Sequence, residues 1–189
     1  ALSTVQETSP GEDEITYAMI KHCHSSLLIL ILHLFNRVFL EHQFPEPWRS
    51  TITIPIPKPH KDCSDPKNGR PITLSCTLCK LMEKILNARL MWYLEKGGHI
   101  QQAQSGFRKN RSTTDHLVKF ETDLRQSLAN RQHTIAVFFD LTKAYDMAWR
   151  YGIINSLYDF GLKGSLPKFI QNFLTDRYFK VRVGITTSD

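Results

Sequence analysis

The stretch Ala136-Val-Phe-Phe-Asp-Leu-Thr-Lys-Ala-Tyr-Asp-Met-Ala-Trp149 decides how this chain is interpreted. Residues 134–139 are rich in β-branched and aromatic side chains, which favours a buried strand that ends in Asp140. Residues 144–158 are expected to form a helix, with residues 141–143 as a tight turn between strand and helix. Such a turn holds a carboxylate at the tip of a rigid element, where a metal and anion-binding N–H groups can meet. An equally good interpretation is that Asp140 only caps the helix.

Composition and charge narrow the class of protein. The 189 residues are 41% hydrophobic and 11% aromatic, which suffices for one domain or two small lobes with a core and excludes a disordered chain. The formal net charge of +6 is uneven, with −3 over residues 1–50, +7 over 51–111 and +2 over 112–189. The basic middle third fits a polyanionic partner, although surplus lysine also serves solubility alone.

Neither a membrane span nor a zinc site is expected. The most apolar run, residues 27–35, is nine residues long and contains His33, whereas a bilayer span needs about 18 or more. The chain starts at Ala1 without a signal-peptide pattern, so we expect an excised or incomplete protein that is not secreted. The Cys76-x-x-Cys79 pair has no second Cys/His pair at zinc-finger spacing, which favours core packing. The four cysteines are expected to be free thiols: Cys23, Cys63, Cys76 and Cys79.

Periodicity predicts a mainly helical chain with one hairpin. Residues 1–10 are expected to be frayed, and Lys80 and Lys84 to lie on a solvated helix face. Pro55 and Pro57 demote the first strand to an edge or twisted strand. A first helix is expected to begin at Pro10, with three acids in its first turn. A second is capped by Ser25 or Ser26 and runs to about His42, and a third is capped by Ser75 or Thr77 and stopped by Gly97-Gly98. Two further helices are expected over 112–128 and 166–174, and strands over 51–57, 71–74 and 178–184.

Two polar loops each leave alternatives open. Residues 58–70 join the hairpin, and their cations either converge on phosphates or form an ordinary solvated loop. Residues 101–111 carry a glycine and an aromatic residue among polar side chains. This second loop is either a nucleic-acid contact or a simple connector.

Taken in order, these segments resemble the reverse transcriptase of non-LTR (LINE-type) retrotransposons, most closely the arthropod jockey-like kind. The resemblance covers nearly the whole chain and rests on an ordered set of short motifs. The motifs are Pro10-Gly-Glu-Asp-Glu-Ile, Phe44-Pro-Glu-Pro-Trp48, Ile56-Pro-Lys-Pro, Arg70-Pro-Ile, Lys80-Leu-Met-Glu-Lys-Ile85, Gln104-Ser-Gly-Phe-Arg, Arg111-Ser-Thr and Phe139-Asp-Leu-Thr-Lys-Ala-Tyr-Asp146.

The resemblance implies an α+β right-hand polymerase, mostly helical, with a short hairpin in the fingers and an incomplete palm sheet. Residues 1–50 are expected to be a helical N-terminal extension, 51–133 the fingers, and 134–189 the start of the palm. The implied activity is RNA-directed DNA polymerisation, in which a DNA primer is extended with dNTPs along an RNA template. The implied cofactor is Mg²⁺, which acts as a pair of ions in two-metal nucleotidyl transfer.

Site residues follow from the same resemblance, position by position. Asp140 is the implied catalytic carboxylate and metal ligand, and Leu141 adds its backbone carbonyl. The incoming dNTP is held by Lys58 and Arg70 on the fingers and by the turn residues Lys143, Ala144 and Tyr145, the last as the steric gate against a ribose 2′-hydroxyl. The template strand is contacted by Gln104, Gly106, Phe107 and Arg108.

The chain also departs from the family pattern. Gly69 and Thr73 replace the usual aromatic residue and serine around Arg-Pro-Ile, and Gly69 is expected to loosen the loop that carries Arg70. The Asp-Asp strand pair is missing, so the 189-residue chain is expected to be an N-terminal fragment that is inactive alone. Asp146 is expected to be structural.

A non-catalytic RNA- or DNA-binding remnant or co-opted module is the alternative function. The parent element is expected to act inside the cell, in the nucleus and the cytoplasm.

Overall fold

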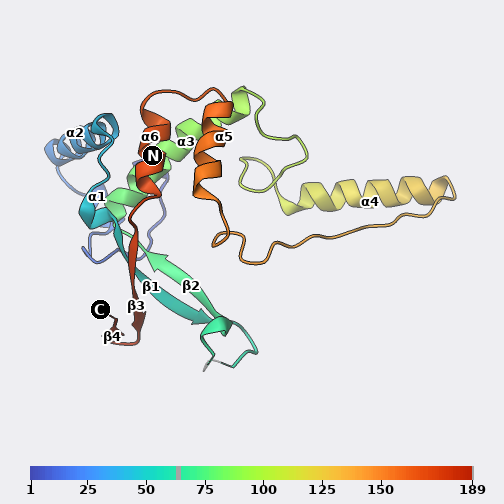
Figure 1. The fold of residues 1–189 in the computed structure, drawn as a ribbon, viewed down its shortest axis with the longest axis horizontal. Helices are drawn as coiled ribbons and strands as arrows, with labels where there is room; N and C mark the ends of the chain where they lie inside the picture. Colours follow the sequence, from blue (N-terminus) through green and yellow to red (C-terminus); the bar gives the residue numbers. More distant parts are fainter. Residues whose placement is uncertain (63–64, 189) are drawn as a thin grey trace. The chain divides into compact units, whose positions relative to one another are not determined.

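A computed structural model of the chain describes residues 1–62 and 65–188, and Cys63 lies outside this part (Figure 1). The described residues form six α-helices and four strands. In chain order these are α1 (Tyr17–Lys21), α2 (Ser25–Glu41), β1 (Ser50–Pro57), β2 (Gly69–Leu74), α3 (Thr77–Lys96), α4 (Thr113–Ala129), α5 (Arg150–Asp159), α6 (Ser165–Phe173), β3 (Tyr178–Val183) and β4 (Thr186–Thr187). The chain divides into two compact units, Ala1–Ala88 with Arg150–Asp189, and Arg89–Trp149.

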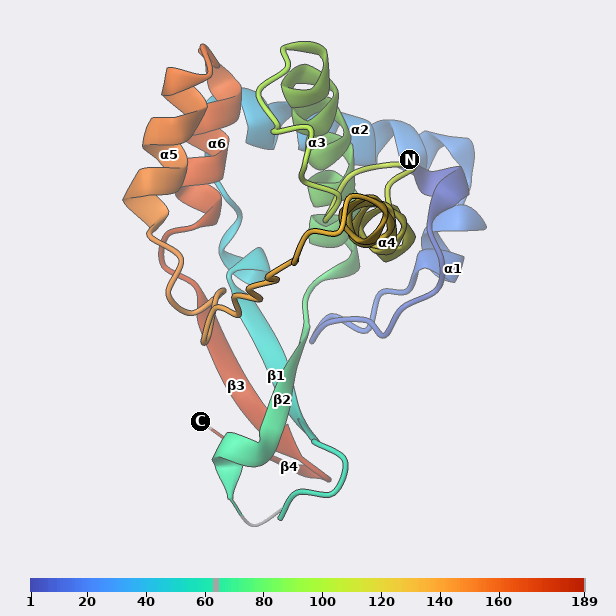
Figure 2. The same cartoon turned by 90° about the vertical axis from the view of Figure 1, so that its right-hand side faces the viewer.

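The sheet of the first unit has the strand order β2-β1-β3-β4 (Figure 2). β1 pairs antiparallel with β2, as the hairpin prediction requires, and parallel with β3 from Ser50 opposite Tyr178 to Thr53 opposite Val181. The prediction that β1 is an edge strand is therefore wrong for its first half. Pro55 and Pro57 lie beyond the part of β1 that pairs with β3, so β1 has only β2 beside it there. Prolines lack an N–H, and at these two positions no hydrogen bond to β3 is lost.

The predicted strand over residues 134–139 does not form. The described residues contain no strand there, and Phe139 is 91% exposed. A strand needs a neighbouring backbone to satisfy its N–H and C=O groups, and no described strand pairs with this segment. The Phe138 ring in this segment makes an edge-on contact with that of Phe120 on α4, with the two centroids 6.1 Å apart. The strand that pairs with β1 on the side away from β2 is β3.

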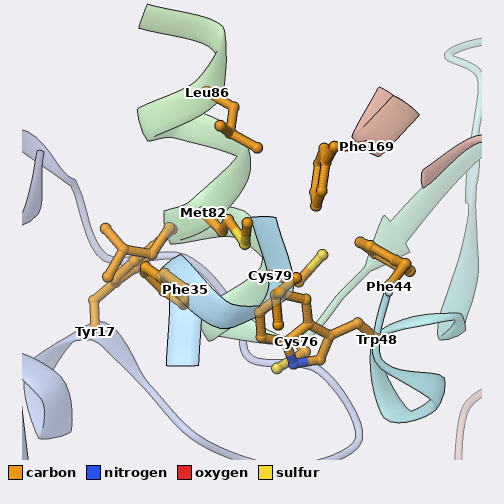
Figure 3. Close-up of a cluster of buried hydrophobic side chains, with 11 residues drawn as sticks. Tyr17, Phe35, Phe44, Trp48, Cys76, Cys79, Met82, Leu86 and Phe169 are labelled. Atoms are coloured by element: carbon orange, nitrogen blue, oxygen red, sulfur yellow. The ribbon is translucent and has the colours of Figure 1, made fainter. Parts of the chain in front are cut away.

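A hydrophobic cluster holds the first unit together (Figure 3). Phe44 is its centre, because its ring meets those of Trp48, Phe169 and Phe173 at centroid distances of 5.8, 6.0 and 5.5 Å. Edge-to-face pairs of this kind add to the burial of the rings themselves. The buried members of the cluster are Tyr17, Phe35, Val38, Phe44, Trp48, Cys76, Cys79, Leu81, Met82, Leu86 and Phe169.

The cysteine predictions are confirmed wherever the structure describes the residue. Cys76 and Cys79 are buried in the cluster, and both are free thiols, as is Cys23. The Cys76 thiol donates to the Asp13 carboxylate at 2.8 Å, and the Cys79 thiol donates to Glu83 at 3.0 Å. The pair therefore serves core packing.

The N-terminal segment is ordered against α3, so the expectation of frayed ends is wrong. Leu2 and Val5 pack against the core cluster. The Lys80 ammonium donates to the Ser9 carbonyl at 2.6 Å and that of Lys84 to the Thr4 carbonyl at 3.0 Å. These two lysines hold the segment along α3 instead of facing water, because backbone carbonyls come within reach of their ammonium groups.

Helix ends are set by side-chain caps. α4 begins as expected, with a capping box in which Ser112 and Asp115 satisfy each other's backbone N–H groups. α1 begins later than predicted: Thr16 caps it by accepting from the Met19 N–H, so the acids at residues 12–14 precede the helix.

α2 spans the predicted residues but is capped by His24, and only Phe35 and Val38 of its apolar stripe are buried. Its other large apolar residues, such as Leu30 at 62%, stay exposed. No helix in residues 1–62 and 65–188 combines the length and apolarity that crossing a bilayer needs.

Candidate nucleotide and template site

The β1–β2 hairpin brings Lys58 and Arg70 to one face. Arg70 lies opposite Ile56 in the ladder, and the Lys58 N–H donates to the Asn68 carbonyl at 2.9 Å, which extends the same register by one step. Because side chains alternate between faces, Lys58 and Arg70 are diagonal neighbours on one side of the hairpin. The two predicted phosphate-binding cations are thus neighbours in the fold.

The two cations differ in their freedom. Arg70 is exposed, whereas the Lys58 ammonium donates to the Lys67 carbonyl at 3.1 Å and so braces the short turn at the end of the hairpin. Gly69 pairs with Pro57 as the first residue of β2. The expected loosening by this glycine is therefore not seen, and Arg70 is held in a regular strand.

Asp140 begins an exposed turn in the second unit. Residues 142–147 form consecutive turns, closed by bonds from the Met147 N–H to the Lys143 carbonyl at 2.9 Å and from the Ala148 N–H to the Tyr145 carbonyl at 3.2 Å. Lys143 is left-handed with φ 51°. The predicted helix start at residue 144 is wrong, since α5 begins at Arg150. Asp140 therefore does not cap a helix, which removes the alternative interpretation of its role.

The side chains around Asp140 point to solvent. Leu141 is 78% exposed and Tyr145 is 82% exposed, and Ala144 is exposed as well. Within residues 1–62 and 65–188, no three His, Cys, Asp or Glu side chains lie together in a way that would hold a metal ion. Mg²⁺ in such sites is usually held by one or two carboxylates together with water and substrate phosphates, and a pair of ions needs more carboxylates than Asp140 alone. The described residues thus do not form the implied two-metal centre.

The loop predicted to contact the template is fastened to the end of α3. The Arg108 guanidinium binds both carboxylate oxygens of Glu95, at 2.8 and 2.7 Å, and also donates to the carbonyls of Gln101 and Gln104 at 3.0 and 3.1 Å. The Arg108 side chain is only 6% exposed. The pair lowers the pKa of Glu95 and raises that of Arg108, in each case chiefly through the hydrogen bond between them. Arg108 is thus a fastening inside the loop, and its donors face the protein.

The same fastening presents the neighbouring residues to solvent. Phe107 is 87% exposed in a left-handed conformation with φ 62°, and Gly106 has open space where a Cβ would lie. The Gln104 amide donates to the Gly106 carbonyl at 3.2 Å. Of the four predicted template residues, Gln104, Gly106 and Phe107 are exposed, and Phe107 presents the one aromatic ring among them. Glu95 belongs to no motif, and its role is not predicted from the sequence. A buried guanidinium such as that of Arg108 needs a carboxylate partner, and this need is the signal that points to Glu95.

The two groups of predicted site residues lie in different compact units. Lys58 and Arg70 belong to the first unit, and the turn from Asp140 and the loop from Gln104 belong to the second.

Along the chain the cationic hairpin comes first, the glycine-containing loop second and the Asp-bearing turn third. Residues 56–188 match the family described as reverse transcriptase (RNA-dependent DNA polymerase), and the chain belongs to that family. This confirms the resemblance read from the motifs.

Several curated relatives agree with the family. The chain is 28% identical over 93% of its length to the probable RNA-directed DNA polymerase from transposon BS of Drosophila melanogaster, and 27% identical over 93% to the RNA-directed DNA polymerase from mobile element jockey of the same species. It is 28% identical over 97% to the retrovirus-related Pol polyprotein from type-1 retrotransposable element R2 of Popillia japonica. These matches cover 19%, 19% and 24% of the relatives, so the chain spans about a fifth to a quarter of their length.

Proposed function

We propose that this chain is the fingers and early palm of an RNA-directed DNA polymerase that copies RNA into DNA from a DNA primer. In this assignment residues 1–50 are the N-terminal extension, 51–133 the fingers and 134–189 the start of the palm. The observation that carries the proposal is the family match over residues 56–188, because it spans Lys58, Arg70 and the turn that begins at Asp140.

The hairpin cations are proposed to hold the triphosphate of the incoming dNTP. Arg70 is exposed on a regular strand, and its guanidinium suits bidentate binding of phosphate oxygens. Lys58 is proposed to act beside it as a point charge after releasing the Lys67 carbonyl.

The turn is proposed to supply the remaining contacts of this chain with the reaction. Asp140 and the carbonyl of Leu141 are part of a Mg²⁺ ligand set whose other members are not among the described residues. The N–H groups around Lys143 and Ala144 face the triphosphate, and the Tyr145 ring excludes a ribose 2′-hydroxyl. The exposure of this turn is compatible with such contacts, because none of its side chains is committed to a core.

A longer protein that contains these residues tests the assignment. Asp140→Ala should reduce primer extension on an RNA template at least a hundredfold, since metal-bound carboxylates contribute several kcal/mol to such transition states. Asp159→Asn is the matched control, because Asp159 is an exposed carboxylate at the end of α5. Wild-type activity in the Asp140 variant would refute the role of this carboxylate.

The 189-residue chain is itself proposed to be inactive. It supplies Asp140 as the one proposed ligand carboxylate, and the described part holds no group of three metal-binding side chains. A primer-extension assay with Mg²⁺ on the isolated chain should show no incorporation above background. Robust incorporation would overturn this part of the proposal.

A second candidate function is non-catalytic binding of RNA or DNA. It is favoured by the exposed cations of the hairpin and by the +7 charge of residues 51–111. It predicts salt-sensitive binding that weakens when Lys58, Lys61 and Arg70 are neutralised together. Binding that is indifferent to salt and to these changes would exclude it.

A further inference from the structure

A hollow of about 380 Å³ lies at the C-terminal end of α3, in the second unit. Its walls are Trp92, Tyr93, Lys96, Gly97 and His99. Three of these five residues are aromatic rings, one is a cation and one is a glycine. None of them belongs to the motifs that define the proposed polymerase site.

The end of α3 fixes the geometry of this hollow. Gly98 is left-handed with φ 66°, the Gly98 N–H donates to the Glu95 carbonyl at 3.2 Å, and the His99 N–H donates to the Leu94 carbonyl at 3.0 Å. This is a glycine-terminated helix end that turns the chain back on itself. The His99 ring consequently stacks on Tyr93, with centroids 5.6 Å apart and planes 17° from parallel.

Gly97 is required for that stack. A Cβ on Gly97 would lie 2.4 Å from Nε2 of His99 and 2.5 Å from its Cδ2, so any side chain there would push the imidazole away. The floor of the hollow thus depends on a glycine that contacts the ring directly.

Trp92 forms the accessible wall. Its side chain is 62% exposed, and the Lys96 ammonium lies 4.8 Å from the centroid of its indole ring. An exposed cation–π contact of this kind is weaker than the stacking of a nucleobase on an aromatic ring. An incoming base can therefore take the place of the ammonium, which is free to move on its four-carbon stem.

The charge around the hollow favours an anionic ligand. Lys96 is a cation on its rim, and the nearest acid in sequence, Glu95, has both carboxylate oxygens bound to Arg108. Glu95 therefore does not oppose a phosphate group. Because Arg108 belongs to the Gln104–Arg108 loop, the same ion pair ties the hollow to the segment that presents Phe107.

We infer that this hollow binds an unpaired base of single-stranded nucleic acid, with the base stacked on Trp92 and the Lys96 ammonium moved to the adjoining phosphate. Aromatic platforms with a neighbouring cation bind single strands because every base has a π face, whereas a duplex keeps its bases stacked inside. That the bound strand is the RNA template rests on the proposed function, whereas the binding of a single strand does not.

The test uses the 189-residue chain and short fluorescein-labelled oligouridylate, without Mg²⁺ or dNTP. Trp92→Ala should weaken binding about tenfold, the loss typical of one stacked base, and Trp92→Phe should restore most of it. Tyr158→Ala is the matched control, because Tyr158 is a half-exposed aromatic residue on α5. Unchanged affinity in Trp92→Ala, or equal binding of a duplex of the same length, would overturn the inference.

Two further variants separate the parts of the hollow. Gly97→Ala should weaken binding several-fold by displacing His99, although it removes no ligand-binding group. Lys96→Gln should weaken binding and reduce its salt dependence more than Lys119→Gln, which removes an exposed cation on α4. Equal effects of the two lysine variants would contradict a phosphate contact at Lys96.

Tryptophan fluorescence measures the stacking directly and does not depend on variants at the hollow that could misfold. In a Trp149→Phe background the exposed indole is that of Trp92, since Trp48 is buried, so oligonucleotide should quench the fluorescence of the folded chain. An absence of quenching at saturating oligonucleotide would overturn the stacking arrangement.

If Trp92-dependent binding persists while Asp140→Ala in the longer protein retains polymerase activity, the proposed catalytic role fails and the hollow stands. If binding does not depend on Trp92 while Asp140→Ala abolishes polymerase activity in the longer protein, the inference about the hollow fails and the proposed catalytic role stands.

Discussion

The carboxylate of Glu95 and the guanidinium of Arg108 form a two-point ion pair, with Nε to Oε1 at 2.8 Å and Nη2 to Oε2 at 2.7 Å. Planar groups paired in this way fix orientation as well as distance. The pair fastens the loop around Phe107 to the end of α3. It also explains why Arg108, which its motif alone assigns to template contact, is little exposed.

Glu95→Gln should loosen this loop without unfolding the chain. Glutamine keeps the size of the side chain but offers one acceptor oxygen and no charge, so amide hydrogens over residues 104–108 should exchange faster. Hydrogen exchange read by mass spectrometry measures this. Glu121→Gln is the control, because it removes an exposed i,i+4 ion pair with Arg125 on α4. Unchanged exchange over residues 104–108 would contradict the fastening role.

The contribution of this pair should depend on pH in one direction. The hydrogen bond from Arg108 lowers the pKa of Glu95 below its ordinary value of 4.5. A carboxylate whose pKa is lowered by folding stabilises the fold fully above the unfolded pKa, and the effect is lost as the pH falls through the folded pKa. The difference in unfolding free energy between the parent chain and Glu95→Gln should therefore be constant at neutral pH and vanish in acid. Urea titrations at a series of pH values check this, and a difference that grew in acid would refute it.

Gly11→Ala should destabilise the first unit. A Cβ at Gly11 would lie 2.7 Å from the Cys76 nitrogen and 2.8 Å from the Ser75 carbonyl carbon, both backbone atoms at the start of α3. Overpacking against backbone costs about 1–3 kcal/mol. Gly106→Ala is the control, because nothing lies within 4 Å of its Cβ position. Equal unfolding free energies for the two variants, measured in urea, would argue against this close approach.

The two core thiols should react slowly. Burial, with a smaller contribution from the bond to Asp13, raises the pKa of Cys76 to about 11, and burial raises the pKa of Cys79 as well. Since the thiolate is the nucleophile, a rise of two pKa units slows reaction about a hundredfold, before any loss of access. In a Cys63→Ser background, a thiol-exchange reagent at pH 8 should label one site, Cys23, before the others. Rapid labelling of three thiols in the folded chain would contradict the buried positions.

Phe169→Ala should be strongly destabilising. Phe169 is 3% exposed and its ring meets those of Phe39, Phe44 and Phe173. Truncation of such a ring costs about 3–5 kcal/mol. Phe179→Ala on β3 removes the same atoms from a side chain that is 65% exposed, so it should cost less than about 1 kcal/mol. Denaturant unfolding compares the two variants, and equal losses of unfolding free energy would argue against the burial of Phe169 in the core cluster.

Local pattern predicted the elements whose stabilising contacts are local. The β1–β2 hairpin and the helices α2, α3, α4 and α6 lie within a few residues of their expected positions, because caps and apolar periodicity are short-range signals. The strand predicted over residues 134–139 does not form, because its stability depends on contacts that are distant in the sequence. Their composition favours a strand, but a strand exists only beside another backbone, and the neighbour that pairs with β1 came from residues 178–181.

The placement of the proposed site residues could be predicted only where it is set by nearby sequence. Lys58 and Arg70 share one hairpin face because pairing register follows from the turn. The internal role of Arg108 was not predictable, because its partner Glu95 is 13 residues earlier and across the Gly97-Gly98 turn. The bonds from Lys80 and Lys84 to the N-terminal segment were likewise hidden, since they join residues more than 70 positions apart.

The parallel pairing of β1 with β3 has a consequence for synthesis on the ribosome. The hairpin can form soon after Leu74 emerges, but the Ser50–Thr53 edge of β1 has to wait for Tyr178–Val181. At about 5–20 residues per second, that wait is on the order of ten seconds. An unpaired edge is a template for pairing with other chains, so nascent chains on one messenger are most exposed to aggregation in this interval.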